Sequence, residues 1–287
     1  MFTKKRNIFT KILIWRYKYI SERQFILVLS ILVGFLAGLG TVLLKYLTLF
    51  IQSVLEGGFI KNYYYSLYFI FPIIGVWLVY LIKKNFIKKE IGHGISTTLY
   101  AISKRSGIIE RYKMFASLIV APITVGFGGS VGLQGPAVST GAALGSNVAS
   151  MFHMNAKTRM LLIGCATAGA MSSMFKAPVA AIVFAVEIFS LDLVFTSLVP
   201  LLLASVAAVI TSYFFRGTDV LFSFELLDAW RVKDIIFYVF LGVATGIASV
   251  YFSKMYFLIT RFFGWFSNAY VKIGIAALAI GLMLYLF

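Results

Sequence analysis

The stretch GGSVGLQGPAVSTGAALGS, from Gly128 to Ser146, decides how this chain folds. Its first nine residues contain four glycines and end in Pro136, within an otherwise apolar region. Proline is favoured at the first position of a helix, where the missing amide hydrogen would have had no partner. We therefore expect the backbone to break within 128–135 and a helix to begin with Pro136 at its first position.

Such a helix start can hold an anion without any basic side chain. Its first amides lack partners within the helix, the helix dipole adds partial positive charge, and glycine lets the backbone approach an ion closely. Alternatively, the glycines only allow helices to pack closely in a membrane. The Gly-x-x-Gly-Pro ending, from Gly132 to Pro136, favours the anion site.

The composition of the whole chain is that of an integral membrane protein. Of its 287 residues, 61% are hydrophobic and only 13% are charged, against about a quarter charged in soluble domains. Uncharged runs such as 114–151 and 193–215 are long enough to cross a bilayer, which takes roughly 20 helical residues. We expect an all-α polytopic membrane protein, in which the long segment 25–55 forms a strongly tilted helix.

The net charge of +16, from 26 basic and 10 acidic residues, does not point to a nucleic-acid partner. The basic residues gather in the N-terminal arm and in the connection 83–113, and the positive-inside rule places both in the cytoplasm. Two predicted crossings, 25–55 and 59–82, lie between them. An even number of crossings returns the chain to the same side of the membrane, which agrees with a cytoplasmic location for both. We expect the lipid bilayer as partner and a cytoplasmic N-terminus, in a prokaryotic inner or plasma membrane.

From Lys113 onward the apolar segments are short and interrupted by small residues, and 179–190 has room for only about three helical turns. Interrupted backbone at membrane depth survives only where protein buries it or where it lines a water-filled path. Transporters use such half-helices to build substrate sites. We expect roughly nine or ten helices in all.

Three motifs of this region resemble the CLC family of chloride channels and chloride/proton exchangers. Gly129 to Ser146 is similar to the family's Gly-[Lys/Arg]-Glu-Gly-Pro region, and LLIGCATAGAMSSMFKAPVAAIVFAVEIF, at 161–189, is similar to a small-residue pattern downstream. GHGIS, from Gly92 to Ser96, stands where the family has Gly-Ser-Gly-Ile-Pro. Order and spacing match across 92–189.

The resemblance implies tilted and broken helices from an inverted-repeat architecture, assembled as a homodimer. It divides the chain into a cytoplasmic basic segment at 1–24, a first repeat at 25–218, and a connection with the first helices of an incomplete second repeat at 219–287. No proline lies beyond Pro200, so the family's second-repeat loop is missing. We expect a truncated form of the architecture.

The resemblance also implies two anion sites and a departure at the gate. The outer site would comprise Gly132, Leu133, Gln134 and Gly135, and the inner site His93, Gly94 and Ile95. The family's titrating gate glutamate is replaced, naturally or by engineering, by Gln134, which is neutral and can donate a hydrogen bond to a halide. The alternative for Gln134 is that it only caps the helix end.

Both proton-handling positions of the family's exchangers lack an acid here. Ile188 stands where the inner proton glutamate would be, directly after Glu187. We expect Glu187 to be a structural acid that pairs with backbone amides or with Lys176, although an ionisable residue in an apolar helix can also be functional. These departures favour passive conduction over coupled exchange.

His93 replaces the serine whose hydroxyl binds the central anion in the family. Its imidazole can donate an N–H, or a full charge when protonated, and this predicts an acid-side pH dependence of conduction. The alternative is an exposed loop histidine. Ser96 replaces the motif proline, which makes the loop's backbone shape less secure.

The leading hypothesis is passive transmembrane conduction of chloride or another small anion. The alternatives are a chloride/proton exchanger with relocated proton groups and a non-conducting truncated membrane protein. An enzyme is not expected, because the chain has two histidines, one cysteine and no arrangement of a nucleophile with a base. We expect no cofactor and no metal site.

Overall fold

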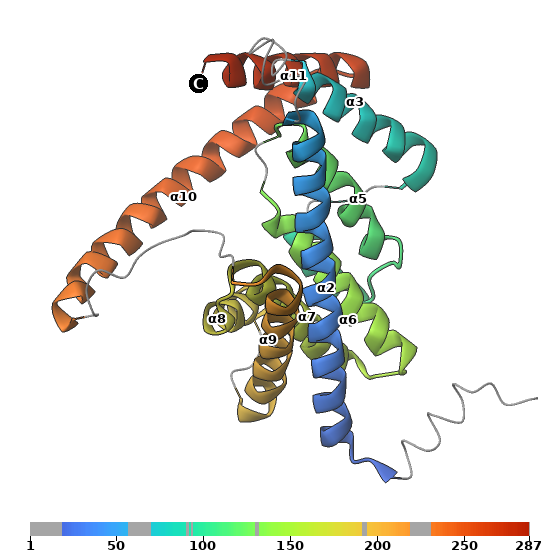
Figure 1. Cartoon of the computed structure of the whole chain (residues 1–287), viewed down its shortest axis with the longest axis vertical. Coiled ribbons are helices and arrows are strands. Elements are labelled where there is room, and N and C mark those ends of the chain that lie inside the picture. The colour runs from blue at the N-terminus through green and yellow to red at the C-terminus, as the bar shows by residue number, and fades with distance from the viewer. Residues whose placement is uncertain are drawn as a thin grey trace, which may run out of the picture.

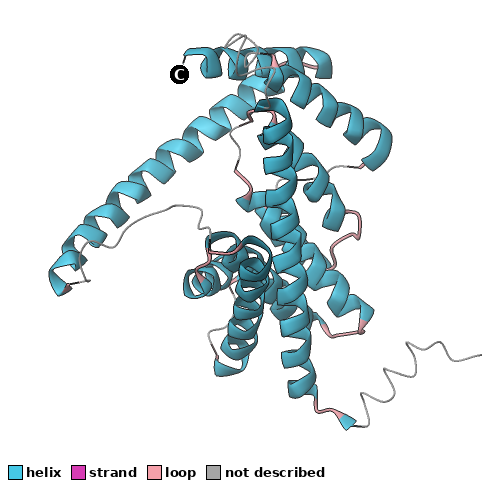
Figure 2. Cartoon of the chain, in the orientation of Figure 1, coloured by secondary structure: helices cyan, strands magenta, loops and turns pink. Residues whose placement is uncertain are grey.

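The structure is a computed structural model that describes residues 19–56, 70–89, 92, 94–129, 132–190, 194–218 and 231–286. Every regular element in these residues is helical (Figure 2), which confirms the predicted all-α class. The ten α-helices are α2 Glu22–Glu56, α3 Phe71–Ile82, α4 Ile95–Arg105, α5 Lys113–Gly126, α6 Gln134–Met151, α7 Ala156–Phe175, α8 Pro178–Phe189, α9 Phe195–Arg216, α10 Ile235–Gly264 and α11 Ala269–Leu286. A π-helical turn, η2 Lys83–Ile87, follows α3, and a 3₁₀ turn, η3 Val232–Asp234, precedes α10.

Three helical segments in the described part are long and apolar enough to cross a membrane: Glu22–Leu55, Thr196–Arg216 and Val232–Gly264. The 35 residues of α2 correspond to about 52 Å at about 1.5 Å per residue. That length exceeds the roughly 30 Å of the hydrocarbon core, so a helix of this length must tilt to keep its apolar side chains in lipid.

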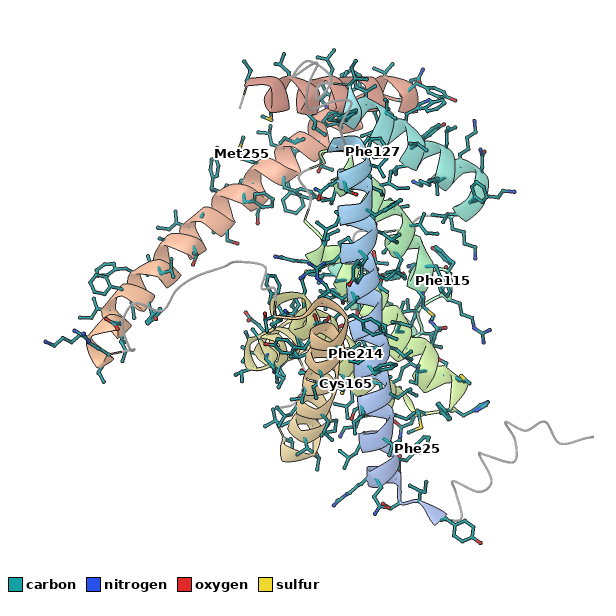
Figure 3. All side chains as sticks on the ribbon, viewed as in Figure 1. Phe25, Phe115, Phe127, Cys165, Phe214 and Met255 are labelled. Atoms are coloured by element: carbon teal, nitrogen blue, oxygen red, sulfur yellow. The ribbon has the colours of Figure 1, made fainter. Side chains whose placement is uncertain are left out.

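The centre of the fold is α7, which packs against α2, α6, α8 and α9 (Figure 1). Fourteen of its 20 residues are buried, and most of them are glycine, alanine, serine or threonine. Cys165, the only cysteine of the chain, lies fully buried in this helix (Figure 3). The helix starts at Asn155, whose side chain accepts a 2.8 Å hydrogen bond from the amide of Thr158.

The small residues bring helix backbones into direct contact. A Cβ on Gly34 of α2 would collide with the carbonyl of Ala204 on α9, and one on Gly145 of α6 would collide with the carbonyl of Leu162 on α7. In lipid, where no hydrophobic effect drives helices together, this close packing supplies the dispersion contacts that hold them. The small-residue pattern of 141–174 is therefore what fixes the helix positions.

Hydroxyl groups join the same helices by hydrogen bonds that would be costly to leave unmade. Ser172 of α7 donates to the carbonyl of Ser205 on α9 at 3.0 Å. Ser146 of α6 donates to the carbonyl of Gly107 at 2.6 Å and accepts from the amide of Ile109 at 2.9 Å. The second pair anchors the connection between α4 and α5 to α6, and so fixes these three helices relative to one another.

The C-terminal helices pack differently. No described residue of α10 is buried, and the helix itself extends away from the helices around α7 (Figure 1). Helix α11 lies against α3. The predicted division at 24/25 and 218/219 stays a prediction, because 1–18 and 219–230 lie outside the described residues.

We expect Gly34→Ala to destabilise the fold by about 1–3 kcal/mol, because the added methyl group overpacks the contact between α2 and α9. The matched control is Gly246→Ala on α10, where nothing lies within 4 Å of the new Cβ; it should be neutral or stabilising by up to about 1 kcal/mol. Thermal unfolding of the purified protein in detergent, followed by tryptophan fluorescence, measures both. Equal melting temperatures for the two variants would contradict the packing argument.

Candidate functional site

Helix α6 begins at Gln134, not at Pro136 as the proline rule predicted. Pro136 is the third helical residue, a position that is equally suitable because amides of the whole first turn lack intrahelical acceptors. The residue before the helix, Leu133, has no side chain that could bond these amides. The amides of Gln134 and Gly135 are thus left to other partners, as the sequence predicted for this helix start.

A second helix start lies beside the first. Helix α4 begins after Gly94, whose φ of 55° is in the left-handed region that favours glycine, and no side chain caps it. A Cβ on Gly94 would lie 3.3 Å from the carbonyl oxygen of Gly135. The N-termini of α4 and α6 therefore meet, although they are far apart in the sequence.

The two helix starts and one side of α5 enclose a cavity of about 510 Å³. Gly94, Ile95 and Ser96 line it from α4, and Gly132, Gly135, Pro136 and Ser139 from α6. Helix α5 contributes Ser117 and the residues one and two turns beyond it. Among the described residues of this lining none carries a charged side chain, and the two helix dipoles both point their positive ends here.

Two largely buried serines belong to the cavity wall, Ser117 and Ser139, each 6% exposed. The hydroxyl of Thr124 donates to the carbonyl of Val120 at 2.9 Å. The hydroxyls of Ser117 and Ser139 are not among the buried side-chain atoms that lack a partner, and each can donate a hydrogen bond to a ligand or water in the cavity. The cavity therefore offers hydroxyl donors in addition to backbone amides.

Neither serine was among the site residues predicted from the sequence. Ser139 follows Gly135 by one helical turn, so the period of the helix alone could have placed both on the cavity side. Ser117 carried no such signal, because it sits in an apolar run with no motif around it.

The predicted site residues divide into three groups. Gly132, Gly135, Gly94 and Ile95 line one common cavity, and their binding of an anion stays a prediction. Leu133 is half-buried and packs against the hydrophobic core. The side chain of Gln134 is exposed and is not part of the cavity wall. His93 lies outside the described residues.

The predicted ion pair between Glu187 and Lys176 is wrong. Glu187 is exposed on α8, and the one ion pair among the described residues joins Arg105 to Glu110. The Lys176 ammonium instead donates to the carbonyl of Gly217 at 2.6 Å, beyond the end of α9. The half-buried Ile188 packs against a core cluster of α6 and α7 residues, and no residue of α8 lines the cavity.

Comparison with known proteins gives the chain its family. Residues 73–287 match the family model described as voltage gated chloride channel. The chain belongs to the CLC family. Members of this family are channels and transporters rather than enzymes, in agreement with the prediction from the sequence.

Individual relatives place the chain in more detail. It is 29% identical over 168 residues to chloride channel protein CLC-f of Arabidopsis thaliana, an alignment that covers 57% of this chain and 22% of the relative. It is 28% identical over 134 residues to the H(+)/Cl(-) exchange transporter ClcA of Vibrio cholerae, covering 46% of this chain and 29% of the relative. The chain thus spans less than a third of the length of these two relatives.

Two solved structures share the fold. A CLC-type fluoride/proton antiporter superposes with a TM-score of 0.75 at 23% identity, over 91% of this chain and 65% of that protein. A slow cyanobacterial Cl⁻/H⁺ antiporter gives a TM-score of 0.68 at 18% identity, over 93% and 64%. At these identities the likeness establishes the architecture, and the chain spans about two thirds of each solved protein.

If the cavity binds an anion, removing its hydroxyls must weaken binding. We expect the double variant Ser117→Ala/Ser139→Ala to raise the Kd for chloride about tenfold, since each lost hydrogen bond contributes about 0.5–1.5 kcal/mol. Calorimetric titration in detergent at constant ionic strength measures it. The control, Ser103→Ala/Ser150→Ala, removes two hydroxyls that bond only within α4 and α6, and its Kd should not change. An unchanged Kd in the Ser117→Ala/Ser139→Ala variant would show that these two serines do not bind chloride.

Proposed function

We propose that this protein conducts chloride, or another small anion, passively across the membrane through the cavity between α4, α5 and α6. The observation that carries the proposal is the meeting of two uncapped helix N-termini at one cavity, shown by the contact of Gly94 with Gly135. Membership of the CLC family supports the same substrate class.

The chemistry of the lining suits transport better than tight binding. An anion that enters must lose water, and the amides at the two helix starts with the hydroxyls of Ser117 and Ser139 can replace part of that hydration shell. None of the described lining residues is basic, so these residues do not hold the anion by a full opposite charge. Conduction requires this balance, in which the ion is bound well enough to enter and weakly enough to leave.

The absence of titrating acids at two positions supports uncoupled movement. Gln134 is neutral at every physiological pH, and Ile188 cannot carry a proton. A coupled exchanger needs groups that take up and release protons in step with the anion. We therefore propose that chloride moves without stoichiometric proton countertransport.

A second candidate is chloride/proton exchange through acids at other positions. It is favoured by the similar proteins, since both solved structures are antiporters and the Vibrio cholerae protein is an exchange transporter. Liposomes that contain the purified protein separate the two functions. Chloride efflux without proton uptake supports the channel, and uptake in fixed proportion to chloride supports the exchanger. A folded preparation with no chloride flux would instead support a non-conducting protein.

A carboxylate introduced at residue 134 should add a second pH dependence to conduction, in which the ionised group reduces the flux of chloride. A carboxylate about 4 Å from a bound anion costs about 4 kcal/mol at an effective dielectric constant of about 20, and a third of this already lowers occupancy about tenfold. We expect Gln134→Glu to reduce chloride efflux from liposomes about tenfold at pH 7. Flux should recover below the carboxyl pKa, near about 4.3, where the group is protonated and neutral.

The matched control for this variant is Gln134→Ala, which removes the side chain but adds no charge. Its efflux should follow the pH profile of the wild type between pH 4 and 7, because it adds no titrating group. A Gln134→Glu variant that follows the wild-type profile over the whole range would place residue 134 away from the ion path.

We also propose that His93, between two glycines of the cavity wall, binds the anion on the inner side. Protonation below its ordinary pKa of about 6.5 adds a positive charge, so wild-type chloride flux should rise from pH 7.5 to 5.5. His93→Ser should abolish this rise. The control is His153→Ser, which changes the other histidine of the chain and should keep the rise; a preserved rise in His93→Ser refutes the proposal.

Two features of the assembly follow from the family and from the charge pattern. We propose a homodimer, and a topology in which the N-terminus and the basic connection after α3 face the cytoplasm. Light scattering of the purified protein in detergent tests the first, and protease access to residues 1–18 in sealed vesicles tests the second.

A further inference from the structure

A second cavity, of about 560 Å³, lies where α3 meets α11 and has an entirely different character. Five lysines surround it: Lys83, Lys84, Lys88, Lys89 and Lys272, with Tyr80 and Ile273 as its apolar wall. The first four follow directly on α3, and the fifth comes from the first turn of α11. This lysine pocket and the cavity of α4, α5 and α6 have no described lining residue in common.

The local backbone explains why the lysines gather. The π-helical turn η2 ends at Lys88, which has a left-handed φ of 51° and donates its amide to the carbonyl of Lys83 at 2.9 Å. This turn folds the basic segment back on itself, so that both ends of the run face one pocket. The rings of Tyr80 and Tyr270 pack edge to face, with centroids 5.5 Å apart, and thereby bring Lys272 of α11 to the same place.

The charge of this pocket is not balanced within the described part of the protein. None of the five lysines forms an ion pair with a carboxylate there. Lys84 lies 6.0 Å from the centre of the Tyr80 ring, a weak contact that leaves its ammonium accessible. Five like charges around one space repel each other, and an anion with several oxygen atoms would relieve this repulsion.

The position of the pocket indicates which anion. Both helices that form it are apolar, and the lysines begin where α3 ends, which is where a membrane helix reaches the lipid headgroups. Phe86, in the middle of the basic run, is 84% exposed, as expected for a side chain that inserts into the interface. Lysine-rich pockets between membrane helices are suited to phosphate headgroups, with the acyl chains lying along the apolar wall.

We propose that the lysine pocket binds a phosphate-bearing ligand, namely the headgroup of an anionic phospholipid of the surrounding bilayer. The site does not depend on the proposed anion conduction and would exist in a non-conducting protein. The binding would hold α11 against α3, because the ligand contacts lysines from both sides of their junction.

Native mass spectrometry of the purified full chain in a neutral detergent tests the proposal, with phosphatidylglycerol as probe and phosphatidylcholine as comparison. We expect the wild type to prefer phosphatidylglycerol and Lys84→Gln/Lys88→Gln/Lys272→Gln to bind it about 100-fold more weakly, at about fivefold for each lysine. The control is Lys104→Gln/Lys233→Gln/Lys254→Gln, which removes three exposed charges elsewhere and should bind like the wild type.

A second arm identifies the source of the phosphate. Inorganic pyrophosphate that displaces phosphatidylglycerol at similar concentration would support a phosphate site for soluble ligands, whereas no displacement supports the lipid headgroup. The proposal is overturned if the wild type shows no preference for phosphatidylglycerol, or if both triple variants lose it equally. Circular dichroism establishes that each variant is folded, which exposed lysine substitutions should not disturb.

Discussion

The structure depends on the direct approach of helix backbones to α7. Residues without bulky side chains, such as Gly34 and Gly145, let α2, α6 and α9 come close enough for carbonyl groups to meet Cα atoms. In a bilayer this packing replaces the hydrophobic effect as the force between helices. The position of α6, and through Ser146 the connection from α4 to α5, follows from it. The cavity is consequently a product of core packing and not of a flexible loop.

The proposed anion site and the proposed lipid site would bind anions by different means. In the first, partial charges on backbone amides and the hydroxyls of Ser117 and Ser139 face a space whose described lining residues are all uncharged. In the second, full charges on lysines surround a space at the end of an apolar helix. Partial charges suit an ion that must move on, whereas full charges suit a ligand that stays. The difference between the sites is thus one of residence time as much as of affinity.

Sequence motifs predicted what depends on local chemistry and on short spacing. The break before Gln134, the short helix α8 and the role of Gly132 and Gly135 in a cavity wall all follow from residues close in the chain. The observed start of α6 lies two residues before the predicted one. Proline is tolerated throughout the first turn, because the amides of this turn have no acceptor within the helix. The predicted pairing of Glu187 with Lys176 was wrong, because the carbonyl of Gly217 after α9 lies close enough to accept a hydrogen bond from Lys176. Ser117 and the meeting of Lys272 with Lys84 depend likewise on contacts between distant helices, which no spacing in the sequence encodes.

The burial of Cys165 has a practical consequence. It is the chain's single thiol and lies with 0% exposure inside α7, out of reach of water-soluble reagents. We therefore expect the unmodified protein not to react with water-soluble thiol reagents, so that it serves as the negative control in labelling experiments. A cysteine introduced at any surface position would be the one reactive group in the molecule, so the sidedness of each loop and the accessibility of each wall of the cavity can be mapped without first removing a native residue.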